Sequence, residues 1–450
     1  MLSNKKVLVL GLAKSGSAAV RLLMKLHASI TINIDQPIET IEECATYKQY
    51  GIEIIAGGHP LELFEQDFDF VIKNPGIPYH KPFILRLQQR NIPIYTEIEF
   101  GYQVAKKQKY IAVTGTNGKT TTVSLVYSIL QAQYSTVHLA GNIGRPLCDV
   151  ILEANLLEEQ DHYIILEMSN FQLLHIDTFT PMVSTITNLS PDHLDYMESL
   201  DAYYASKMRI YKNQTTTPFV CNLDDATMQN YIQKYPLDCP VITFSMKQKA
   251  DCYIGKDHII YQEEEIIGLQ DIVVIGDHNL QNIMIAICIA KACHVPTRII
   301  NQQICCFTGV EHRLEFVGDM SGVRIYNDSK ATNVEATCTA LAAFRQPVIL
   351  LLGGYDKGLD ITAIKQYRDI IRYIITFGQA GSRFLKDLQL DQSMYVTDLK
   401  TATIKALDLA AVGDAIVLSP ATSSYDAFTN YEERGKAFKE YVQMYIKKNR

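Results

Sequence analysis

The 450-residue sequence has no Cys-x-x-C pair and no long hydrophobic run. Its ten cysteines stand at irregular spacing, so they predict neither a zinc cage nor a disulfide framework, and we expect buried thiols in a reducing cytoplasm. The longest apolar runs, such as residues 283–290, end well before the ~18 residues that a membrane-spanning helix requires. We therefore expect a cytoplasmic protein that does not insert into a membrane.

An excess of positive charge is also absent. The 42 lysines and arginines are outnumbered by 49 aspartates and glutamates, which gives a net charge of -7. This balance argues against broad binding to nucleic acid, although local basic pockets for small anions stay possible. With 47% hydrophobic and 20% charged residues, the chain should fold throughout, and ~150 residues per domain suggest about three domains.

Short β-rich runs lead into helical patterns in three successive segments, which is typical of α/β domains. The first run, residues 7–10, follows two lysines but leads into a glycine, so we interpret it as part of a strand and not as a signal peptide. We place the boundaries near residues 98 and 309, giving domains 1–98, 99–309 and 310–450. The expected strands are 6–10, 29–34, 68–72, 110–113, 163–166, 183–187, 323–326, 348–352, 373–377 and 415–418.

The strongest motif lies between the strand at 110–113 and a helix that is expected to end near residue 131. It reads Gly115-Thr116-Asn117-Gly118-Lys119-Thr120. In a P-loop, backbone N–H groups cradle phosphates, the lysine reaches the β- and γ-oxygens, and the last hydroxyl binds Mg²⁺. The usual pattern has a further glycine where this chain has Val113. A glycine turn that merely opens a helix is the alternative, but the order of strand, motif and helix favours phosphate binding.

A weaker glycine motif follows the first strand. Gly11, Ala13 and Gly16 stand where a dinucleotide fingerprint has three glycines, and Asp35 has the separation expected of a ribose-binding carboxylate. A nucleotide site and a simple tight turn both remain open from these residues.

Further polar residues follow the expected strands of the second segment. Glu167 would emerge beside the P-loop as a metal ligand or as a solvated carboxylate, and Asp192 and His193 would line the same edge. Lys207, close to Arg209, is more typical of an exposed charged helix face.

The third segment carries loops that suit carboxylates or phosphates at the carboxyl edge of a sheet. These loops are Glu311-His312-Arg313, Asn327-Asp328-Ser329-Lys330, Gly353-Gly354-Tyr355-Asp356-Lys357 and Ser419-Pro420-Ala421.

Taken together, these residues and several more motifs resemble the Mur ligase family along the whole chain. The additional motifs are Gly141-Asn142-Ile143-Gly144, the run from Glu167 to Leu173, and His278-Asn279 with Asn282. The Phe171-Gln172-Leu173 run, the Gly-Gly-x-Asp-Lys loop and the lack of Asp-Asn-Pro-Arg favour a glutamate-adding member. The family's P-loop also resembles the shortened form with Val113.

The resemblance implies an α/β protein with a Rossmann-like N-terminal domain, a central ATPase-type domain with a parallel sheet, and a Rossmann-like C-terminal domain. It implies ATP-dependent ligation of D-glutamate to UDP-N-acetylmuramoyl-L-alanine through an acyl phosphate and a tetrahedral intermediate. Both small molecules would be partners of a monomer whose C-terminal domain closes over the site. Folylpolyglutamate synthase and a nucleotide-dependent switch are the alternatives, and the former lacks a UDP-binding domain of this kind.

Site roles follow from the same resemblance. Lys119, Lys207, His193 and Glu167 would be catalytic, and Mg²⁺, as two ions, would be held by Thr120, Glu167, His193 and Lys207, the lysine as a carbamate. ATP would be bound by Gly115, Thr116, Asn117, Gly118, Lys119, Thr120, Thr121, Asn282, His312, Arg313, Asp328 and Lys330. The UDP-substrate would contact Ser15, Asp35 and Asn142, and D-glutamate would contact Thr332, Lys357, Ser424 and Tyr431.

Overall fold

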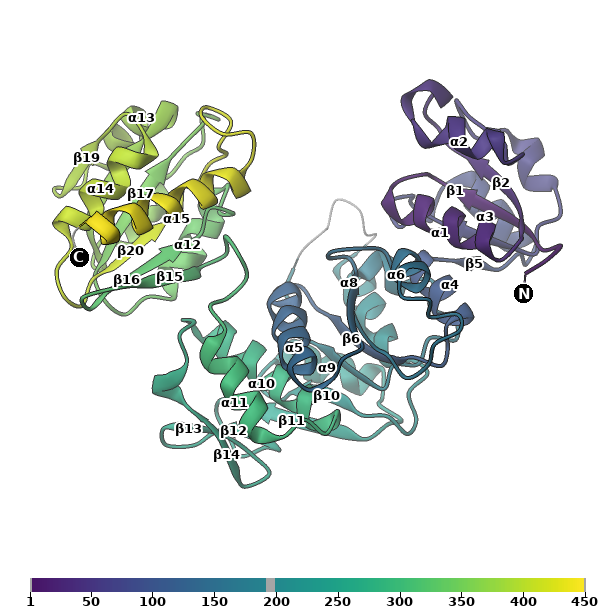
Figure 1. Cartoon of the computed structure of the whole chain (residues 1–450), viewed down its shortest axis with the longest axis horizontal. Helices are drawn as coiled ribbons and strands as arrows, with labels where there is room; N and C mark the ends of the chain where they lie inside the picture. Colours follow the sequence, from purple (N-terminus) through teal and green to yellow (C-terminus); the bar gives the residue numbers. More distant parts are fainter. Residues whose placement is uncertain (1, 192–198, 449–450) are drawn as a thin grey trace. The chain divides into compact units, whose positions relative to one another are not determined.

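The computed structural model describes residues 2–191 and 199–448. Contacts divide the chain into two compact units, Met1–Ile266 with Gln281–Gln303, and Ile267–Leu280 with Ile304–Arg450. The described residues form three sheets flanked by helices, which confirms the α/β class (Figure 1). The boundaries at residues 98 and 309 stay predictions.

The first sheet is parallel, with the strand order β3-β2-β1-β4-β5. Because side chains alternate along a strand, β1 sends Val7 and Val9 into the cluster with α1, and Leu8 and Leu10 into the cluster with α3. Both faces are thus covered. The elements are β1 Lys6–Leu10, α1 Lys14–Lys25, β2 Ser29–Asn33, α2 Glu43–Gln49, β3 Glu53–Ile55, β4 Phe70–Lys73, α3 Pro82–Gln89, β5 Ile94–Tyr95 and α4 Glu97–Val104.

The second sheet has the strand order β14-β13-β12-β11-β10-β9-β6-β8-β7. Its elements are β6 Lys109–Thr114, α5 Lys119–Gln133, β7 Val137–Gly141, α6 Leu147–Glu153, β8 Tyr163–Glu167, α7 Asn170–Leu173, β9 Val183–Ile186, α8 Leu200–Met208, β10 Phe219–Asn222, α9 Ala226–Lys234, β11 Val241–Ser245, β12 Cys252–Ile254, β13 His258–Tyr261, β14 Glu264–Gly268, α10 Asp277–Ala292 and α11 Thr297–Cys306.

Strand β6 lies between β8 and β9 and runs parallel to both. In this register Glu167, the last residue of β8, pairs with Val113 on one side and with Gly141 on the other. The carboxyl end of β6 therefore brings the glycine-rich loop next to the end of β8, as the strand pattern predicts.

The third sheet has the strand order β15-β16-β20-β17-β18-β19, and only the β15–β16 pair is antiparallel. Helices α12 and α13 pack on the face that includes Leu350, and α14 and α15 pack on the opposite face with Leu351. This is a doubly wound arrangement. The elements are β15 Glu315–Met320, β16 Val323–Asn327, α12 Val334–Ala342, β17 Val348–Gly353, β18 Ile371–Phe377, α13 Gly378–Leu388, β19 Ser393–Tyr395, α14 Leu399–Leu409, β20 Ala415–Leu418 and α15 Tyr431–Lys448.

All ten cysteines are free thiols, and seven of them are buried. No helix within residues 2–191 and 199–448 combines the length and the apolar character needed to cross a membrane.

A buried carboxylate in α4 anchors the loop at residues 177–179. Glu99 is fully buried and accepts hydrogen bonds from the backbone N–H groups of Asp177, Thr178 and Phe179, at 3.2, 2.9 and 3.1 Å. Hydrogen bonds to a charged acceptor are stronger than neutral ones, and a buried donor that loses its acceptor keeps its desolvation cost.

We predict that Glu99→Ala lowers the stability of the first unit by about 3 kcal/mol, because it leaves three backbone donors without an acceptor. Calorimetry should show a thermal midpoint lower by roughly 5–10 °C. Glu158→Ala, at an exposed position, is the matched control and should change the midpoint little. An unchanged midpoint in Glu99→Ala would contradict the anchoring role.

Candidate functional site

A glycine-rich loop joins β6 to α5 and forms a backbone cradle. Gly115 and Gly118 have φ angles of +142° and +80°, in the region that favours glycine. A Cβ on Gly115 would clash with Thr187 Oγ1, and a Cβ on Gly118 would clash with Asn282 Oδ1. Only glycine fits at both positions, so the loop keeps its backbone open at the start of a 15-residue helix, where anions bind.

Two lysine side chains converge on one carbonyl oxygen of this loop. Lys119 Nζ donates to Gly115 O at 2.8 Å and to Thr116 O at 2.7 Å. Lys207 Nζ donates to the same Gly115 O at 2.9 Å and lies 4.5 Å from the centre of the Tyr203 ring. The structure therefore places the Lys207 ammonium next to Lys119 at the glycine-rich loop.

Lys207 is 2% exposed, so its interpretation from the residues alone as part of an exposed helix face is wrong. The physical reason is that α8 buries the face that carries Tyr203, Ser206 and Lys207. The resemblance to the family, by contrast, implies a site role for this lysine.

Glu167 lies beside the first turn of α5. Thr120 Oγ1 donates to Glu167 Oε2 at 2.8 Å, and Asn142 Nδ2 donates to Glu167 Oε1 at 2.9 Å. Glu167 is 3% exposed, so these contacts hold a buried carboxylate in one orientation. The structure thus brings Thr120, Asn142 and Glu167 together.

Carboxylate and hydroxyl oxygens are the ligands that Mg²⁺ prefers, and Glu167 with Thr120 fits that preference beside the glycine-rich loop. Among the described residues, no group of three or more His, Cys, Asp or Glu side chains is arranged so that it could hold a metal ion. His193 and its neighbour Asp192 lie outside the described residues, and the metal role of His193 stays a prediction.

Polar residues that follow β9 form hydrogen bonds with the glycine-rich loop. No sequence motif predicted this role for them. Asn117 N donates to Asn188 Oδ1 at 3.0 Å, and Asn188 Nδ2 donates back to Asn117 O at 3.0 Å. Thr116 Oγ1 donates to Ser190 O at 3.0 Å. The available signal was the position of Asn188 and Ser190 just after a strand that neighbours β6.

The structure also brings Asn282 of α10 to this loop. Asn282 is 4% exposed, and Thr122 Oγ1 donates to its Oδ1 at 3.2 Å. Thr121, on the first turn of α5, is buried. Asn282 thus lies next to Gly118, and its place in a nucleotide site and its contact with adenine stay predictions.

The turn after β1 is tight and lies close to α1, and a nucleotide site there stays a prediction. Gly11 has a φ of +85°, and a Cβ on Gly16 would clash with Gly11 O, so α1 packs directly on the turn. Ser15 Oγ accepts from Asn74 Nδ2 at 3.3 Å, and Asp35 is exposed just beyond β2. Of the three residues predicted to contact the UDP-substrate, Ser15 and Asp35 thus belong to the part of the chain that forms the first sheet. Asn142 instead lies beside Glu167 of the second sheet.

In the second unit, Asp328 clamps two loops. Its Oδ1 accepts from Leu314 N at 3.1 Å and its Oδ2 accepts from Ser419 Oγ at 2.7 Å. Burial disfavours the charged form and raises the pKa of Asp328 to about 7. Lys330 N donates to His312 O at 3.0 Å, so the predicted residues His312, Asp328 and Lys330 belong to one cluster.

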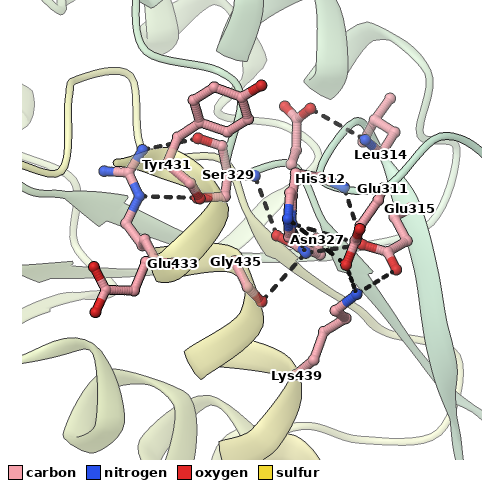
Figure 2. A network of polar contacts seen from close by, with 12 residues as sticks. Glu311, His312, Leu314, Glu315, Asn327, Ser329, Tyr431, Glu433, Gly435 and Lys439 are labelled. Carbon is pink, nitrogen blue, oxygen red and sulfur yellow. Dashed lines mark hydrogen bonds and ion pairs between the residues drawn. The ribbon is translucent and has the colours of Figure 1, made fainter. Parts of the chain in front are cut away.

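Figure 2 shows the surroundings of His312, which include Asn327, Glu315 and Lys439. His312 is 2% exposed, and its neighbour Arg313 is exposed. Burial lowers the pKa of His312 below its usual range, although nearby carboxylates act in the opposite direction. This imidazole is therefore held in the neutral form at neutral pH.

Arg434 of α15 donates hydrogen bonds to three loops. These loops carry residues that are predicted to bind the amino acid or the nucleotide. Its guanidinium donates to Ser329 Oγ at 3.0 Å and Ser329 O at 2.8 Å, to Thr422 O at 3.0 Å, and to Gly353 O at 3.5 Å. Arg434 is fully buried, which lowers its pKa to about 10 and still leaves it charged at neutral pH. No local pattern in the sequence indicated this arginine.

The four predicted D-glutamate residues lie on these loops and at the start of α15. Ser424 is 1% exposed, Lys357 is exposed, and Thr332 is partly buried. Tyr431 begins α15, and its ring lies 5.8 Å from Lys330 Nζ. Their roles in binding the amino acid stay predictions.

Comparisons with known proteins show which family this chain resembles. The chain matches the model of the Mur ligase middle domain over residues 113–290 and that of the Mur ligase, glutamate ligase domain over residues 312–422. It is 39% identical, over 97% of its length and 96% of the relative, to UDP-N-acetylmuramoylalanine–D-glutamate ligase of Geobacillus sp. (strain WCH70). It is also 39% identical to the protein of that name from Bacillus mycoides (strain KBAB4), over 98% of both chains.

Solved structures are similar in fold. The match to UDP-N-acetylmuramate-alanine ligase MurC of Thermotoga maritima has a TM-score of 0.55 at 18% identity and covers 98% of this chain and 99% of that one. The match to MurF of Acinetobacter baumannii has a TM-score of 0.56 at 15% identity and covers 93% and 89%.

The three sheets and the matched domain models define the class of this protein, an α/β ligase whose middle domain has a glycine-rich loop between β6 and α5. The chain belongs to the Mur ligase family.

We predict that Arg434→Met destabilises the second unit by about 3–5 kcal/mol, because it leaves buried carbonyl groups of three loops without a donor. Urea unfolding followed by circular dichroism should show an earlier transition. Lys436→Met, at an exposed position two residues further along α15, is the matched control and should unfold like the unchanged chain. Equal midpoints for the two variants would contradict the linking role of Arg434.

Proposed function

We propose that this chain joins D-glutamate to UDP-N-acetylmuramoyl-L-alanine at the expense of ATP, acting as a monomer in the cytoplasm. The observation that carries the proposal is the 39% identity, over 97% of the chain, to a relative named for this reaction. The clustering of Lys119, Thr120, Glu167 and Lys207 at the end of β6 supports it, because phosphoryl transfer needs cations and metal ligands close together.

The proposed reaction has two steps. The carboxylate oxygen of the L-alanyl group attacks the γ-phosphorus of ATP, the bond to the β-phosphate oxygen breaks, and ADP leaves. The amine of D-glutamate then attacks the resulting acyl phosphate, and the tetrahedral intermediate loses inorganic phosphate and a proton to give the amide. The first step is needed because phosphate is a far better leaving group than an oxide.

Within this reaction, the Lys119 ammonium would stabilise the charge that spreads over the transferring phosphoryl group. Thr120 and Glu167 would hold Mg²⁺, together with His193 and with Lys207 as a carbamate. When bound, Mg²⁺ offsets the negative charge of the phosphate oxygens. Glu167 is suited to this work because Thr120 and Asn142 fix both of its oxygens.

The remaining predicted residues would bind substrates. Ser15, Asp35 and Asn142 would contact the UDP-substrate. Backbone groups of Gly115, Thr116, Asn117, Gly118 and Thr121 would bind the phosphates, and Asn282, His312, Arg313, Asp328 and Lys330 the rest of the nucleotide. Lys357 would pair with a carboxylate of D-glutamate, and Thr332, Ser424 and Tyr431 would orient the amino acid.

The defining assay supplies ATP, Mg²⁺ and UDP-N-acetylmuramoyl-L-alanine with D-glutamate, L-glutamate or L-lysine in turn. We expect phosphate release and a product of the matching mass with D-glutamate alone. Strong turnover with L-lysine would refute the proposed substrate, and nucleotide binding without phosphate release from any mixture would favour a nucleotide-dependent switch instead.

The carbamate at Lys207 makes a separate prediction. Lys207→Ala should lower kcat at least 100-fold, because it removes the anion that would hold Mg²⁺. A 100-fold loss corresponds to about 2.7 kcal/mol of transition-state stabilisation. Short carboxylic acids should restore part of the activity because they replace the missing anion. Lys212→Ala, at an exposed lysine five residues further along, is the control. Full activity of Lys207→Ala without added acid would disprove the carbamate role.

A further inference from the structure

His312 occupies a backbone conformation that few residues of its type adopt. Its φ of +66° lies in the left-handed region, and its side chain is buried against α15, where a Cβ on Gly435 would clash with His312 Nδ1. Such strain persists only where surrounding contacts enforce it, and it is frequent at functional sites. Figure 2 shows this histidine beside Asn327, which itself contacts Gly435 of α15.

The orientation of the Asn327 amide follows from its partners. Its Oδ1 accepts from Ser329 N at 3.2 Å, and its Nδ2 donates to Glu315 Oε2 at 2.9 Å. The reverse orientation would set the amide oxygen against the Glu315 carboxylate, so Nδ2 must point this way. The same Nδ2 lies 2.9 Å from His312 Nδ1.

This contact determines the tautomer of His312. An amide nitrogen can only donate, so His312 Nδ1 must be a bare acceptor, and the single proton of the neutral ring is on Nε2. The lowered pKa of His312 agrees with a neutral ring. The titratable groups that face it are Glu311, Glu315, Tyr431, Glu432 and Lys439.

The Nε2 atom is buried and has no hydrogen-bond partner among the described residues. The nearest carboxylate oxygen, Glu311 Oε1, is 3.7 Å away, beyond hydrogen-bond distance, and it accepts from Lys439 Nζ at 2.6 Å. A buried donor of fixed orientation without an acceptor is unusual in a folded protein and suits an acceptor supplied by a ligand.

We propose that Asn327 is a positioning residue that fixes His312 in the tautomer whose Nε2–H donates to an acceptor atom of the bound nucleotide. The inference rests on the proposed function for the identity of the ligand. It adds a residue, Asn327, that acts through His312 and does not itself touch the nucleotide.

The test uses the full chain with ¹⁵N-labelled histidine. Two-bond ¹H–¹⁵N spectra distinguish a protonated ring nitrogen from a bare one, and His312→Gln identifies the signals of His312. We expect protonation at Nε2 in the unmodified chain, and a changed Nε2–H shift with slower proton exchange on addition of ATP and Mg²⁺. A proton on Nδ1 would overturn the proposal without any variant.

Asn327→Asp replaces the donor by an acceptor, so Nδ1 should become protonated. We expect the KM for ATP to rise at least fivefold, with less than a twofold change in the KM for D-glutamate. Gln443→Glu adds the same charge at an exposed position of α15 and should change neither the tautomer nor either KM. An unchanged tautomer in Asn327→Asp would overturn the role of Asn327.

Glu311→Gln tests the competing partner. If the Nε2–H signal responds to Glu311→Gln and not to ATP, the acceptor is Glu311 and the ligand part of the proposal is wrong. If calorimetry shows no ATP binding, the proposed function and the ligand part both fail, while the tautomer measurement still decides the role of Asn327.

Discussion

The carbonyl oxygen of Gly115 accepts hydrogen bonds from the ammonium groups of both Lys119 and Lys207, and the candidate site of the first unit is built around this shared acceptor. Two cations so close together repel each other, and a carbonyl dipole offsets only part of that repulsion. An anion between them would lower the energy further. On the proposed function, the γ-phosphate of ATP is one such anion, and carbamylation of Lys207 would convert one cation into an anion at the same place.

The surroundings of this oxygen are held in place by contacts that can be named one by one. Glycine at positions 115 and 118 lets Thr187 and Asn282 approach the loop, and Asn188 then binds the loop from the end of β9. Each of these side chains comes from a buried strand end or a helix that packs on the sheet. Site groups supported in this way keep their geometry without a ligand to order them.

Local patterns were sufficient to predict the α/β class and most of the longer strands. The strands at 6–10 and 415–418 have the predicted bounds, because both are short apolar runs that end at a polar or glycine residue. Two- and three-residue strands such as β3, β5 and β19 were missed, since so few residues carry no periodicity.

The candidate site was predictable where one motif contains its residues and unpredictable where distant segments meet. The glycine-rich loop was predictable because its motif spans only six consecutive residues. Lys207, in contrast, is buried against a loop that lies 92 residues earlier in the chain. Arg434 contacts Ser329 across 105 positions, and Asn327 contacts His312 across 15 through a left-handed turn. Burial of a charged side chain by tertiary packing leaves no trace in local composition.

The position of Arg434 also limits how this unit can vary in sequence. Its five N–H groups are shared among the strand-end loops that carry Ser329, Gly353 and Thr422, so a change in one loop alters the geometry available to the others. Substitutions at different positions of these loops should therefore combine non-additively. Through Arg434, the loops at the ends of β16, β17 and β20 form one hydrogen-bonded unit, so a change in one loop should be better tolerated when the others change with it.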